Sequence, residues 1–445
     1  MRNMKQSIFN LSYTMDGYYI ILNTKTQNLI RFPREQKSLI DEILQQNIKS
    51  VNPEILKILM EKGYIIDDDV DELKEIYKQC YELVNSNILY LTIMPTYTCN
   101  LACVYCFQHH IPGAIIDDIM VHKIINAVEK NIQKYSALYL EWFGGEPLLA
   151  REQVLYMNKK FKEICNKVKV PYAARITTNG YFLDLKTFEQ LYKSNCFVYY
   201  ISIDGEKQTH DKQRPCKNGQ GSYDKIMENL KQIKQRVPFR NFRIEIRVNC
   251  SKSSYDNFNI FLSDFEKKFG NDRRFSLVIE TINDWSERTE SMNREKKLLN
   301  FSDLEILSQM AKKYNVQLAS TDKHMLNTQI CQAAKRNAYS IFYDGTIHKC
   351  QMAQESEKFC QLEKIGNITD NGEFRIEKDK EKLWVNDVFP KLCENCKVLP
   401  ICFGKKCIFQ KEIQGQDCID IEQKFLNSFM SCDSSKVDLI PLYIL

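Results

Sequence analysis

The sequence predicts an α/β protein built around a partial, TIM-like (β/α)6 barrel, and three observations lead to this fold class. Apolar strands alternate with amphipathic helices through the middle of the chain, about 85 residues precede that pattern, and cysteines gather beyond it. With 445 residues the chain is too long for one ordinary core, so we expect several domains. The expected parts are an N-terminal domain, the barrel, a charged connection and a cysteine-rich region, at residues 1–85, 86–285, 286–330 and 331–445.

The first 85 residues form the pattern of a small α/β domain. Two β-rich runs separated by a polar turn predict a hairpin, and two amphipathic runs predict helices. The second helix is expected to begin at Pro53 and end at Gly63, the usual positions of these residues at helix ends. The expected hairpin strands, helices and closing strand lie at residues 18–24, 28–32, 35–46, 53–63 and 64–69.

The barrel is predicted from repeated strand–helix units. Helical stretches such as 118–135 and 255–269 separate the strands, and this alternation indicates a parallel sheet with covering helices. Six units fit an open barrel better than a closed eight-fold one, although periodicity alone does not decide between them. A further helix is expected at 303–315, in the connection. The six strands are expected at residues 88–96, 137–145, 173–180, 197–205, 243–250 and 275–281.

Composition excludes several other classes of protein. Hydrophobic residues make up 44%, which is a globular value, and no apolar run is long enough to span a membrane. The first residues show no apolar stretch followed by a cleavage site, so we expect a cytoplasmic protein. A formal net charge of +5 is small for this length and gives little reason to expect nucleic acid as a partner.

Cysteine is over-represented, with 17 residues in the chain. A secreted protein would use them for disulfides, but a cytoplasmic chain of this size is expected to use them as metal ligands. Three lie between residues 99 and 106, and nine lie beyond residue 330. We therefore expect two separate metal-binding regions.

Cys99, Cys103 and Cys106 form a CxxxCxxC motif directly after the first barrel strand. Three thiolates can hold three irons of a [4Fe–4S] cluster, whereas most electron-transfer clusters have four cysteine ligands. The remaining iron would then be open to another ligand. In α/β barrels functional groups lie at the carboxyl ends of strands, where this loop is placed. A zinc site, a disulfide or three unrelated core cysteines is the alternative interpretation.

At these residues the sequence resembles the radical S-adenosylmethionine (SAM) superfamily, with the aromatic Tyr105 immediately before the third cysteine. After the second strand comes a segment similar to the family's GGEP motif, whose backbone meets the amino group of the cofactor's methionine. Adjacent glycines permit close backbone approach, and the glutamate offers a charge-assisted acceptor for an ammonium group. The residues of this segment are Gly144, Gly145, Glu146 and Pro147.

The next two strands end in TTNG (177–180) and SIDG (202–205). In similar enzymes the serine of the latter motif helps to hold the carboxylate of SAM, which makes Ser202 a candidate. Arg214 could pair with the same carboxylate, or it could be a surface arginine. Asn179 and Asp204 are expected to shape their loops by capping turns.

The resemblance also implies a mechanism. The open iron would chelate the amino and carboxylate groups of SAM, and one electron from the cluster would cleave the cofactor to a 5′-deoxyadenosyl radical. That radical would remove hydrogen from an unreactive C–H bond, with the protein providing position and the exclusion of water and oxygen. An electron donor such as flavodoxin or ferredoxin is implied as a partner. No residue stands out as a catalytic base.

The cysteines beyond the barrel resemble the SPASM extension, which in related enzymes binds auxiliary [4Fe–4S] clusters. A C…G…C pattern runs from Cys331 to Cys350, with a strand–turn–strand expected at residues 343–345, and a CxxC motif follows at 393–396. By this resemblance one cluster is held by Cys393, Cys396, Cys402 and Cys418, and a second by Cys331, Cys350 and Cys407.

The ligand assignment leaves alternatives open. Four residues separate Cys402 from Cys407 rather than the usual three, and the fourth ligand of the second cluster is either Cys360 or a substrate thiolate. Cys418 is preferred to Cys432 because its surroundings resemble the family's closing cysteine. A zinc site is the competing interpretation, because paired CxxC motifs are typical of zinc. It would use Cys393, Cys396, Cys402 and Cys407.

The N-terminal domain narrows the resemblance further. A small winged-helix-like domain before such a barrel and SPASM extension is similar to maturases of ribosomally made peptides. There it binds the leader of a precursor peptide, often as a strand added to a sheet edge, and the 18–32 hairpin would be that edge. DNA binding is disfavoured because residues 1–85 contain 11 Lys+Arg against 13 Asp+Glu. The domain could also be a packing element.

These features predict a peptide maturase that forms a thioether or carbon–carbon cross-link. The enzymatic alternatives are a sulfatase-type maturase, which produces formylglycine, and a peptide epimerase. A non-catalytic iron–sulfur electron carrier or scaffold is the alternative from another class. The GGEP segment and the three-cysteine motif favour catalysis, since a carrier needs neither an open iron nor a cofactor site.

Overall fold

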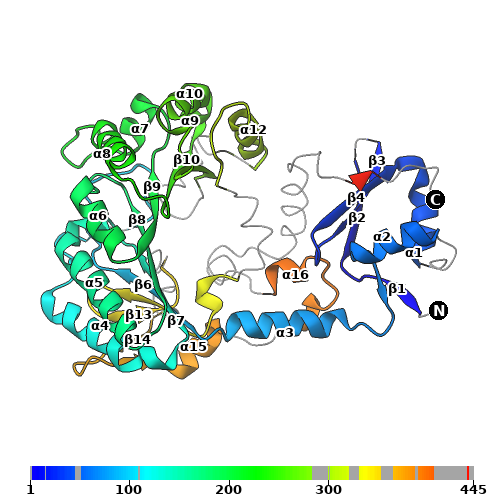
Figure 1. The fold of residues 1–445 in the computed structure, drawn as a ribbon, viewed down its shortest axis with the longest axis horizontal. Helices are drawn as coiled ribbons and strands as arrows, with labels where there is room; N and C mark the ends of the chain where they lie inside the picture. The colour runs from blue at the N-terminus through cyan, green and yellow to red at the C-terminus, as the bar shows by residue number, and fades with distance from the viewer. Residues whose placement is uncertain are drawn as a thin grey trace. The chain divides into compact units, whose positions relative to one another are not determined.

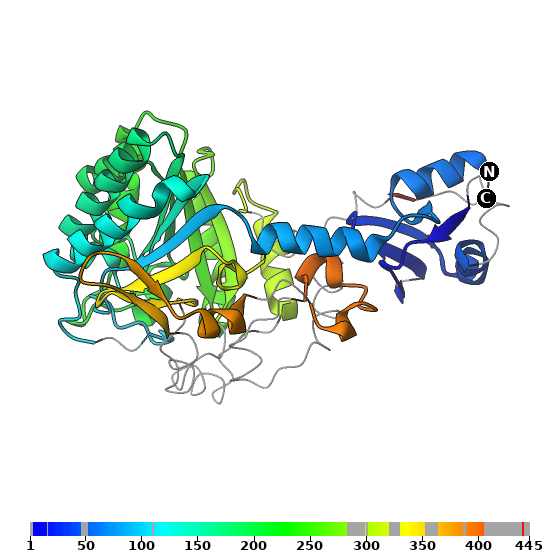
Figure 2. The ribbon, with the colours of Figure 1, turned by 90° about the horizontal axis from the view of Figure 1, so that it is seen from below.

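The protein divides into two compact units, seen in a computed structural model (Figures 1 and 2). The terminal unit comprises residues 1–85, 322–334 and 386–445, and the barrel unit comprises residues 86–321 and 335–385. The residues that the structure describes are 3–15, 17–45, 52–108, 111–282, 299, 301–319, 330–351, 364–385, 389–404 and 438–439.

All six predicted strands of the barrel unit are confirmed, and they lie side by side in chain order. Each pairs in parallel with its neighbour, as strand–helix repetition requires. The strands are β6 (Ile88–Met94), β7 (Ala137–Trp142), β8 (Tyr172–Thr178), β9 (Cys196–Ser202), β10 (Arg243–Cys250) and β11 (Phe275–Thr281).

Helices cover one face of this sheet, as Figure 1 shows for α4, α5, α6 and α8. Trp142 lies on that face and donates from Nε1 to Asn158 of α5 at 3.0 Å. Every second residue therefore points to the other face, which carries polar side chains. The helices are α4 (Asp118–Asn131), α5 (Arg151–Lys167), α6 (Leu185–Lys193), α7 (Lys207–Gln213), α8 (Tyr223–Arg236), α9 (Lys252–Asp256), α10 (Phe258–Phe269) and α12 (Phe301–Ala311).

The sheet continues beyond β6 with four more strands, drawn in yellow and orange in Figure 2. β12 (Ala338–Phe342) pairs in parallel with β6, and β13 (Thr346–His348) returns beside it across the expected turn, where Gly345 has a φ of +79°. β14 (Lys364–Ile368) and β15 (Phe374–Ile376) complete the sheet. The segment expected as one C-terminal domain is thus shared between the two units. Among the described strands β11 and β15 are not joined, so this sheet is open.

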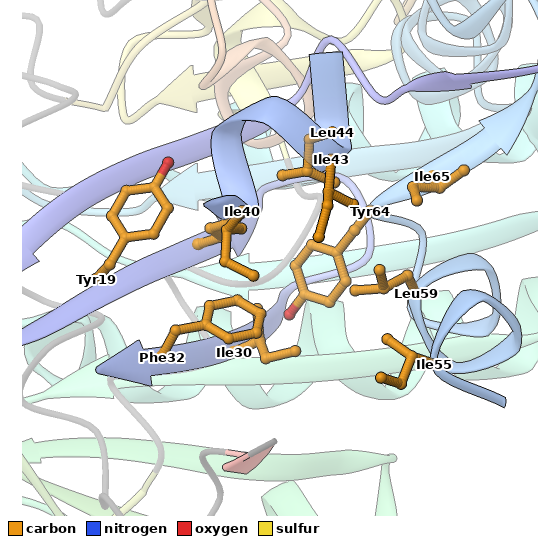
Figure 3. Packing of buried hydrophobic residues seen from close by; sticks show 11 residues of the cluster. Tyr19, Ile30, Phe32, Ile40, Ile43, Leu44, Ile55, Leu59, Tyr64 and Ile65 are labelled. Atoms are coloured by element: carbon orange, nitrogen blue, oxygen red, sulfur yellow. The ribbon is translucent and has the colours of Figure 1, made fainter. Parts of the chain in front are cut away.

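The terminal unit confirms the predicted hairpin, helices and closing strand. Asn52 caps α2 by accepting from the Glu54 amide, and Pro53 occupies the first helical position. Apolar residues of the sheet, α1 and α2 pack together in the core of Figure 3. The elements are β1 (Met4–Gln6), β2 (Asn10–Met15), β3 (Tyr18–Asn23), β4 (Asn28–Pro33), α1 (Lys37–Gln45), α2 (Pro53–Glu61), β5 (Ile65–Asp67) and α3 (Glu72–Val84).

One expectation about this sheet is wrong. The first strand of the hairpin, β3, is not an edge, because β2, a strand that was not predicted, pairs along its outer side. The second strand, β4, pairs with β3 on one side and with residues 438–439 (β16, Asp438–Leu439) on the other, at Ile30 and Arg31. A described edge therefore exists at β2, and along the part of β4 outside those two pairs.

Residues 389–404 pack against this domain within the terminal unit. Tyr77 of α3 stacks on Phe389 with 3.9 Å between ring centroids, and the Thr24 hydroxyl donates to the Lys397 carbonyl. Leu22 and Val398 bury each other in a small apolar cluster. No helix in the described part of the chain is long and apolar enough to cross a membrane.

Candidate functional site

The three predicted iron ligands lie on the loop between β6 and α4, at the carboxyl edge of the barrel sheet. Cys99 and Cys103 are buried in one small cluster with Leu101 and Cys216, and the half-buried Cys106 packs against it. Burial raises the pKa of Cys99 to about 12 and that of Cys103 to about 11. As free groups these two are therefore thiols at neutral pH, and a bound metal would be needed to hold them as thiolates.

The first half of this loop is held against the end of β7. The Gly145 amide donates to the Thr96 carbonyl and the Glu146 amide to the Thr98 carbonyl, both at 3.0 Å. A Cβ at Gly144 would stand 2.5 Å from the Thr96 oxygen, and one at Gly145 would stand 2.4 Å from the Thr98 oxygen. The two glycines are thus required for close approach of the cysteine loop, a structural reason that the sequence did not reveal.

Glu146 joins the ends of two neighbouring strands. Its fully buried carboxylate accepts from the Thr178 hydroxyl and the Asn179 amide, both at 2.7 Å, and from the Leu148 amide at 3.0 Å. Burial raises the pKa of Glu146, and these three hydrogen bonds oppose that shift. The expected ammonium partner remains a prediction, because the carboxylate already has three donors. Pro147 follows at the first position of the 3-10 helix η4 (Pro147–Ala150).

Asn179, expected as a loop-shaping residue, also reaches the cysteine loop. Its Oδ1 accepts from the Tyr181 amide, which is the turn-capping contact anticipated from the sequence. Its Nδ2 donates to Asn100 at 2.8 Å and lies 3.9 Å from the Cys99 sulfur. Asn179 therefore connects the end of β8 to the first cysteine.

The second half of the loop is hydrogen-bonded to the segment after α7. Backbone bonds join the Ala102 amide to the Pro215 carbonyl at 2.8 Å and the Val104 amide to the Gln213 carbonyl at 3.0 Å. This pairing brings Arg214 to the same side of the barrel as Cys103. Arg214 is 8% exposed, so its interpretation as a surface residue is wrong.

Arg214 meets Tyr105 and Asp204 in a buried polar network. Arg214 Nη1 donates to the Tyr105 hydroxyl at 2.5 Å, and that hydroxyl donates to Asp204 Oδ2 at 2.5 Å. Asn249 of β10 also donates to the hydroxyl, at 3.1 Å. Asp204 has side-chain partners beyond the turn-capping role expected of it. The buried Arg214 Nε finds no partner among the described residues and is available to a ligand.

His210 stabilises this network through a hydrogen bond to the backbone of Asp204. Its Nδ1 accepts from the Asp204 amide at 3.3 Å, which assigns the ring proton to Nε2, the atom 3.0 Å from the Ser222 hydroxyl. Burial, and the positive charge of Arg214, lower the pKa of His210 to about 3. The ring is therefore neutral at physiological pH.

Ser202 lies half-buried at the end of β9, on the face of the sheet away from the helices. Its partner in the parallel ladder is Arg247 of β10, an exposed arginine on the same face. Sequence reasoning did not single out Arg247. The signal was available, because charged residues alternate with apolar ones along β10.

A second missed group lies further down the same face. Arg175 donates to Glu141 at 2.5 Å, and its guanidinium is 5.5 Å from the ring centroids of both Tyr139 and Tyr200. Glu141 is buried, and the other three are half-buried. The two tyrosines and the ion pair form a polar patch on the face of the sheet away from the helices, where a substrate group could bind.

The donor set of the cysteine loop fits an iron–sulfur cluster better than a single ion. Within the described ranges no three Cys, His, Asp or Glu side chains are grouped to hold one metal ion. Three thiols on a single loop can instead each bind a different iron, as [4Fe–4S] clusters require.

The C-terminal cysteines are only partly described. Cys331 is exposed in the terminal unit, and Cys350 is half-buried after β13 in the barrel unit. Three others share residues 389–404, where Cys393 is buried and Cys396 and Cys402 are half-buried. The remaining predicted or alternative ligands lie outside the described residues: Cys360, Cys407, Cys418 and Cys432.

Residues 93–244, which include the cysteine loop and the network around Arg214, match the model of the Radical SAM superfamily. The chain carries a radical SAM domain. Its predicted family resemblance is thereby confirmed, as is the α/β fold class with a mostly parallel sheet.

Similar proteins are named as sulfatase-maturating enzymes. The chain is 28% identical over 202 residues to the cysteine-type anaerobic sulfatase-maturating enzyme of Clostridium novyi, which covers 42% of this chain and 50% of that protein. It is 30% identical over 187 residues to the serine-type enzyme of Bacteroides thetaiotaomicron, covering 39% and 43%. The matched parts thus span about half of these relatives or less.

A solved structure shares the fold of the radical SAM domain. Native anSMEcpe with bound AdoMet and the Cp18Cys peptide superposes with a TM-score of 0.57 at 20% identity. The likeness covers 77% of this chain and 96% of that one. At this level of identity the comparison establishes the fold alone.

Proposed function

We propose that this protein is a radical SAM maturase that abstracts hydrogen from a ribosomally made precursor peptide and forms a thioether or carbon–carbon cross-link in it. The observation that carries the proposal is the position of the three-cysteine loop at the carboxyl edge of a radical SAM domain. The names of the relatives support maturation of another polypeptide, and the fold shared with anSMEcpe supports SAM as cofactor.

In this proposal Cys99, Cys103 and Cys106 hold a [4Fe–4S] cluster. When bound, SAM and the cluster would supply the 5′-deoxyadenosyl radical that abstracts hydrogen. The backbone of Gly144 and Gly145 would present its polar groups to the cofactor's amino group, while the buried loop contacts keep water from the cluster. A flavodoxin or ferredoxin would supply the electron, in a cytoplasmic setting.

The carboxylate of SAM has three candidate partners on this chain. Ser202 and Arg247 face each other in the ladder on the barrel's polar face. Arg214 is already bonded to Tyr105 and paired with Asp204, and its buried Nε has no partner among the described residues. We therefore place the carboxylate nearer to Ser202 and Arg247, with Arg214 as a supporting charge.

Two auxiliary [4Fe–4S] clusters are part of the proposal. Cys393, Cys396 and Cys402 share one short segment, which supports a common site completed by Cys418. Cys331, Cys350 and Cys407 would hold the second cluster. An auxiliary cluster could accept the electron that remains when a substrate radical closes a new bond.

The terminal unit would bind the leader of the precursor peptide as an added strand. Support comes from β4, which already accepts a short parallel strand at Ile30 and Arg31. Amide hydrogen exchange with a leader peptide tests this assignment. We expect new protection within β4, through displacement of residues 438–439, or within β2; unchanged exchange in both strands would contradict it.

The experiment for the whole proposal is co-expression with a candidate precursor peptide, followed by the intact mass of that peptide. We expect a loss of two hydrogens per cross-link, absent when the enzyme carries Cys103→Ala. An unchanged mass with the wild-type enzyme would contradict cross-linking of that peptide and direct attention to epimerisation, which leaves mass unaltered.

A sulfatase-type activity is the second candidate, favoured by the names of the relatives. It would oxidise a cysteine or serine of a target protein to formylglycine. Oxidation of serine also removes two hydrogens, so mass alone does not separate the two. Capture of the product by a hydrazide reagent does, because formylglycine is an aldehyde and a cross-link is not.

A further inference from the structure

The contacts of Tyr105 fix the middle of the Cys103–Cys106 segment. Its hydroxyl donates once, to Asp204, and accepts twice, from Arg214 and Asn249. A phenol has one proton to donate and lone pairs for two donors, so the capacity of this group is fully used. The side chain one position before the third cysteine therefore has a single well-defined place.

The partners of Tyr105 are themselves held by buried contacts outside the cysteine loop. The Asp204 amide bonds to His210, and the Asp204 carbonyl accepts from Ser254 at 2.8 Å. The Arg214 carbonyl accepts from the Ser222 hydroxyl at 2.7 Å. The network thus connects the cysteine loop to β9, α7 and the segment that follows β10.

Two opposite charges lie within this network. Arg214 Nη1 and Asp204 Oδ2 are 3.8 Å apart, and both side chains are almost completely buried. Both groups are bonded to Tyr105, which lies within the Cys103–Cys106 segment. Such charges are weakly screened when they are removed from solvent. Reduction of a cluster adds negative charge, so the arginine would favour it and the aspartate would oppose it.

We propose that Tyr105, Asp204 and Arg214 form a positioning network that fixes the Cys103–Cys106 segment and sets the reduction potential of the cluster bound there. The inference rests on the proposed function, because it requires a cluster on this loop. Each charge is costly to bury, and at this distance the two offset each other. Removing either one should therefore move the potential, in opposite directions.

The test is a redox titration of reconstituted, SAM-free protein, followed by electron paramagnetic resonance of the loop cluster. The signal of that cluster is identified by its loss in Cys103→Ala. At a fixed applied potential we expect Asp204→Asn to raise the ratio of reduced to oxidised cluster about tenfold, equivalent to about 59 mV for one electron. Arg214→Gln should lower the same ratio by about tenfold.

Two further variants separate the network from general effects of mutation. Lys212→Gln removes a positive charge two residues from Arg214, but the lysine is exposed, so the ratio should change less than about twofold. Arg214→Lys keeps the positive charge, so its ratio of reduced to oxidised cluster should stay close to that of the wild type. Tyr105→Phe alters no charge and should lower the iron retained per folded chain, with folding checked by circular dichroism.

Each outcome decides the inference. Equal potentials in Asp204→Asn and Arg214→Gln, or shifts of the same sign, would overturn the electrostatic part. Full iron content in Tyr105→Phe would overturn the positioning part. A wild-type loop that binds no cluster would contradict the proposed function, and this inference with it; a bound cluster with unresponsive variants would contradict the inference alone.

Discussion

At the scale of single residues, the site depends on glycine, whose lack of a Cβ lets two backbone segments approach closely. Gly145 has no φ in the left-handed region, so its backbone would suit other residues, yet a Cβ there would meet the Thr98 carbonyl at 2.4 Å. Gly219 is the reverse case, with a φ of +81° and nothing within 4 Å of an added Cβ. The first glycine is required by packing and the second by conformation.

These two glycines give a matched prediction. Gly145→Ala should destabilise the protein by about 3 kcal/mol or more and lower its iron content, because backbone rather than a flexible side chain must move. Gly219→Ala should cost about 1 kcal/mol and leave iron unchanged. Chemical denaturation and iron analysis measure both. Equal losses of stability would contradict the assigned role of Gly145.

His210 predicts how stability depends on pH. Its pKa is about 3 in the folded state and about 6.5 when unfolded, so between these values only the unfolded chain takes up the proton. Stability should be full above pH 6.5 and fall towards pH 3, by up to about 1.4 kcal/mol per pH unit. His348, with a similarly lowered pKa, adds a comparable loss.

The His210→Asn variant isolates the contribution of this residue. Its free energy of unfolding, measured by denaturant titration, should fall less steeply from pH 7 to pH 4 than that of the wild type. The difference in slope should correspond to the uptake of about one proton fewer on unfolding. The same slope in both proteins would show that His210 is not neutral and buried as described.

At the scale of elements, residues 389–404 and the N-terminal domain form one structure. Tyr77 of α3 stacks on Phe389 and donates to Glu394 at 3.2 Å, whereas Tyr81, one turn later, is 57% exposed. The segment with three predicted cluster ligands therefore depends on a helix far away in sequence. No local pattern in the sequence could have shown this.

The two tyrosines provide the corresponding prediction. Tyr77→Leu should destabilise the terminal unit by about 1–3 kcal/mol through loss of the aromatic pair and of the partly buried hydroxyl contact with Glu394. Tyr81→Leu should change stability by less than about 0.5 kcal/mol. Thermal unfolding of both variants checks the difference. If Tyr81→Leu were the more damaging, the packing of 389–404 on α3 would be contradicted.

Elements were predicted best where a pattern is local. The six barrel strands and both N-terminal helices follow from periodicity and end signals, and the structure places them within a few residues of expectation. The strand β2 was missed although NLSYTM alternates polar and apolar residues, a pattern that indicates a strand with one buried face. The pairing of β12 with β6 joins residues some 250 positions apart, which periodicity does not encode.

The candidate site shows the same division. Its cysteines, glycines and Ser202 stood at strand ends, where motif and topology coincide. The burial of Arg214 and its bond to Tyr105 arise from contacts between separate loops, so the sequence left a surface position open. The prediction that β3 is a sheet edge failed for the same reason, since edges are defined by pairing partners.

At the scale of the whole molecule, the division into units affects how function can be tested. Removing residues 1–85 would delete α3 and β3, and with them the surface that holds residues 389–404. Loss of peptide binding in such a truncation would therefore mix leader recognition with damage to a predicted cluster site. Hydrogen exchange on the intact chain avoids this ambiguity.

The measurement that tests the central claim most directly is formation of 5′-deoxyadenosine from SAM by anaerobic, cluster-loaded and reduced protein. We expect 5′-deoxyadenosine and methionine in equal amounts from the wild type, and none above background from Cys103→Ala. If wild-type protein with a fully assembled and reduced loop cluster formed no 5′-deoxyadenosine, with or without peptide, the radical SAM mechanism would be contradicted and an electron-carrier role favoured.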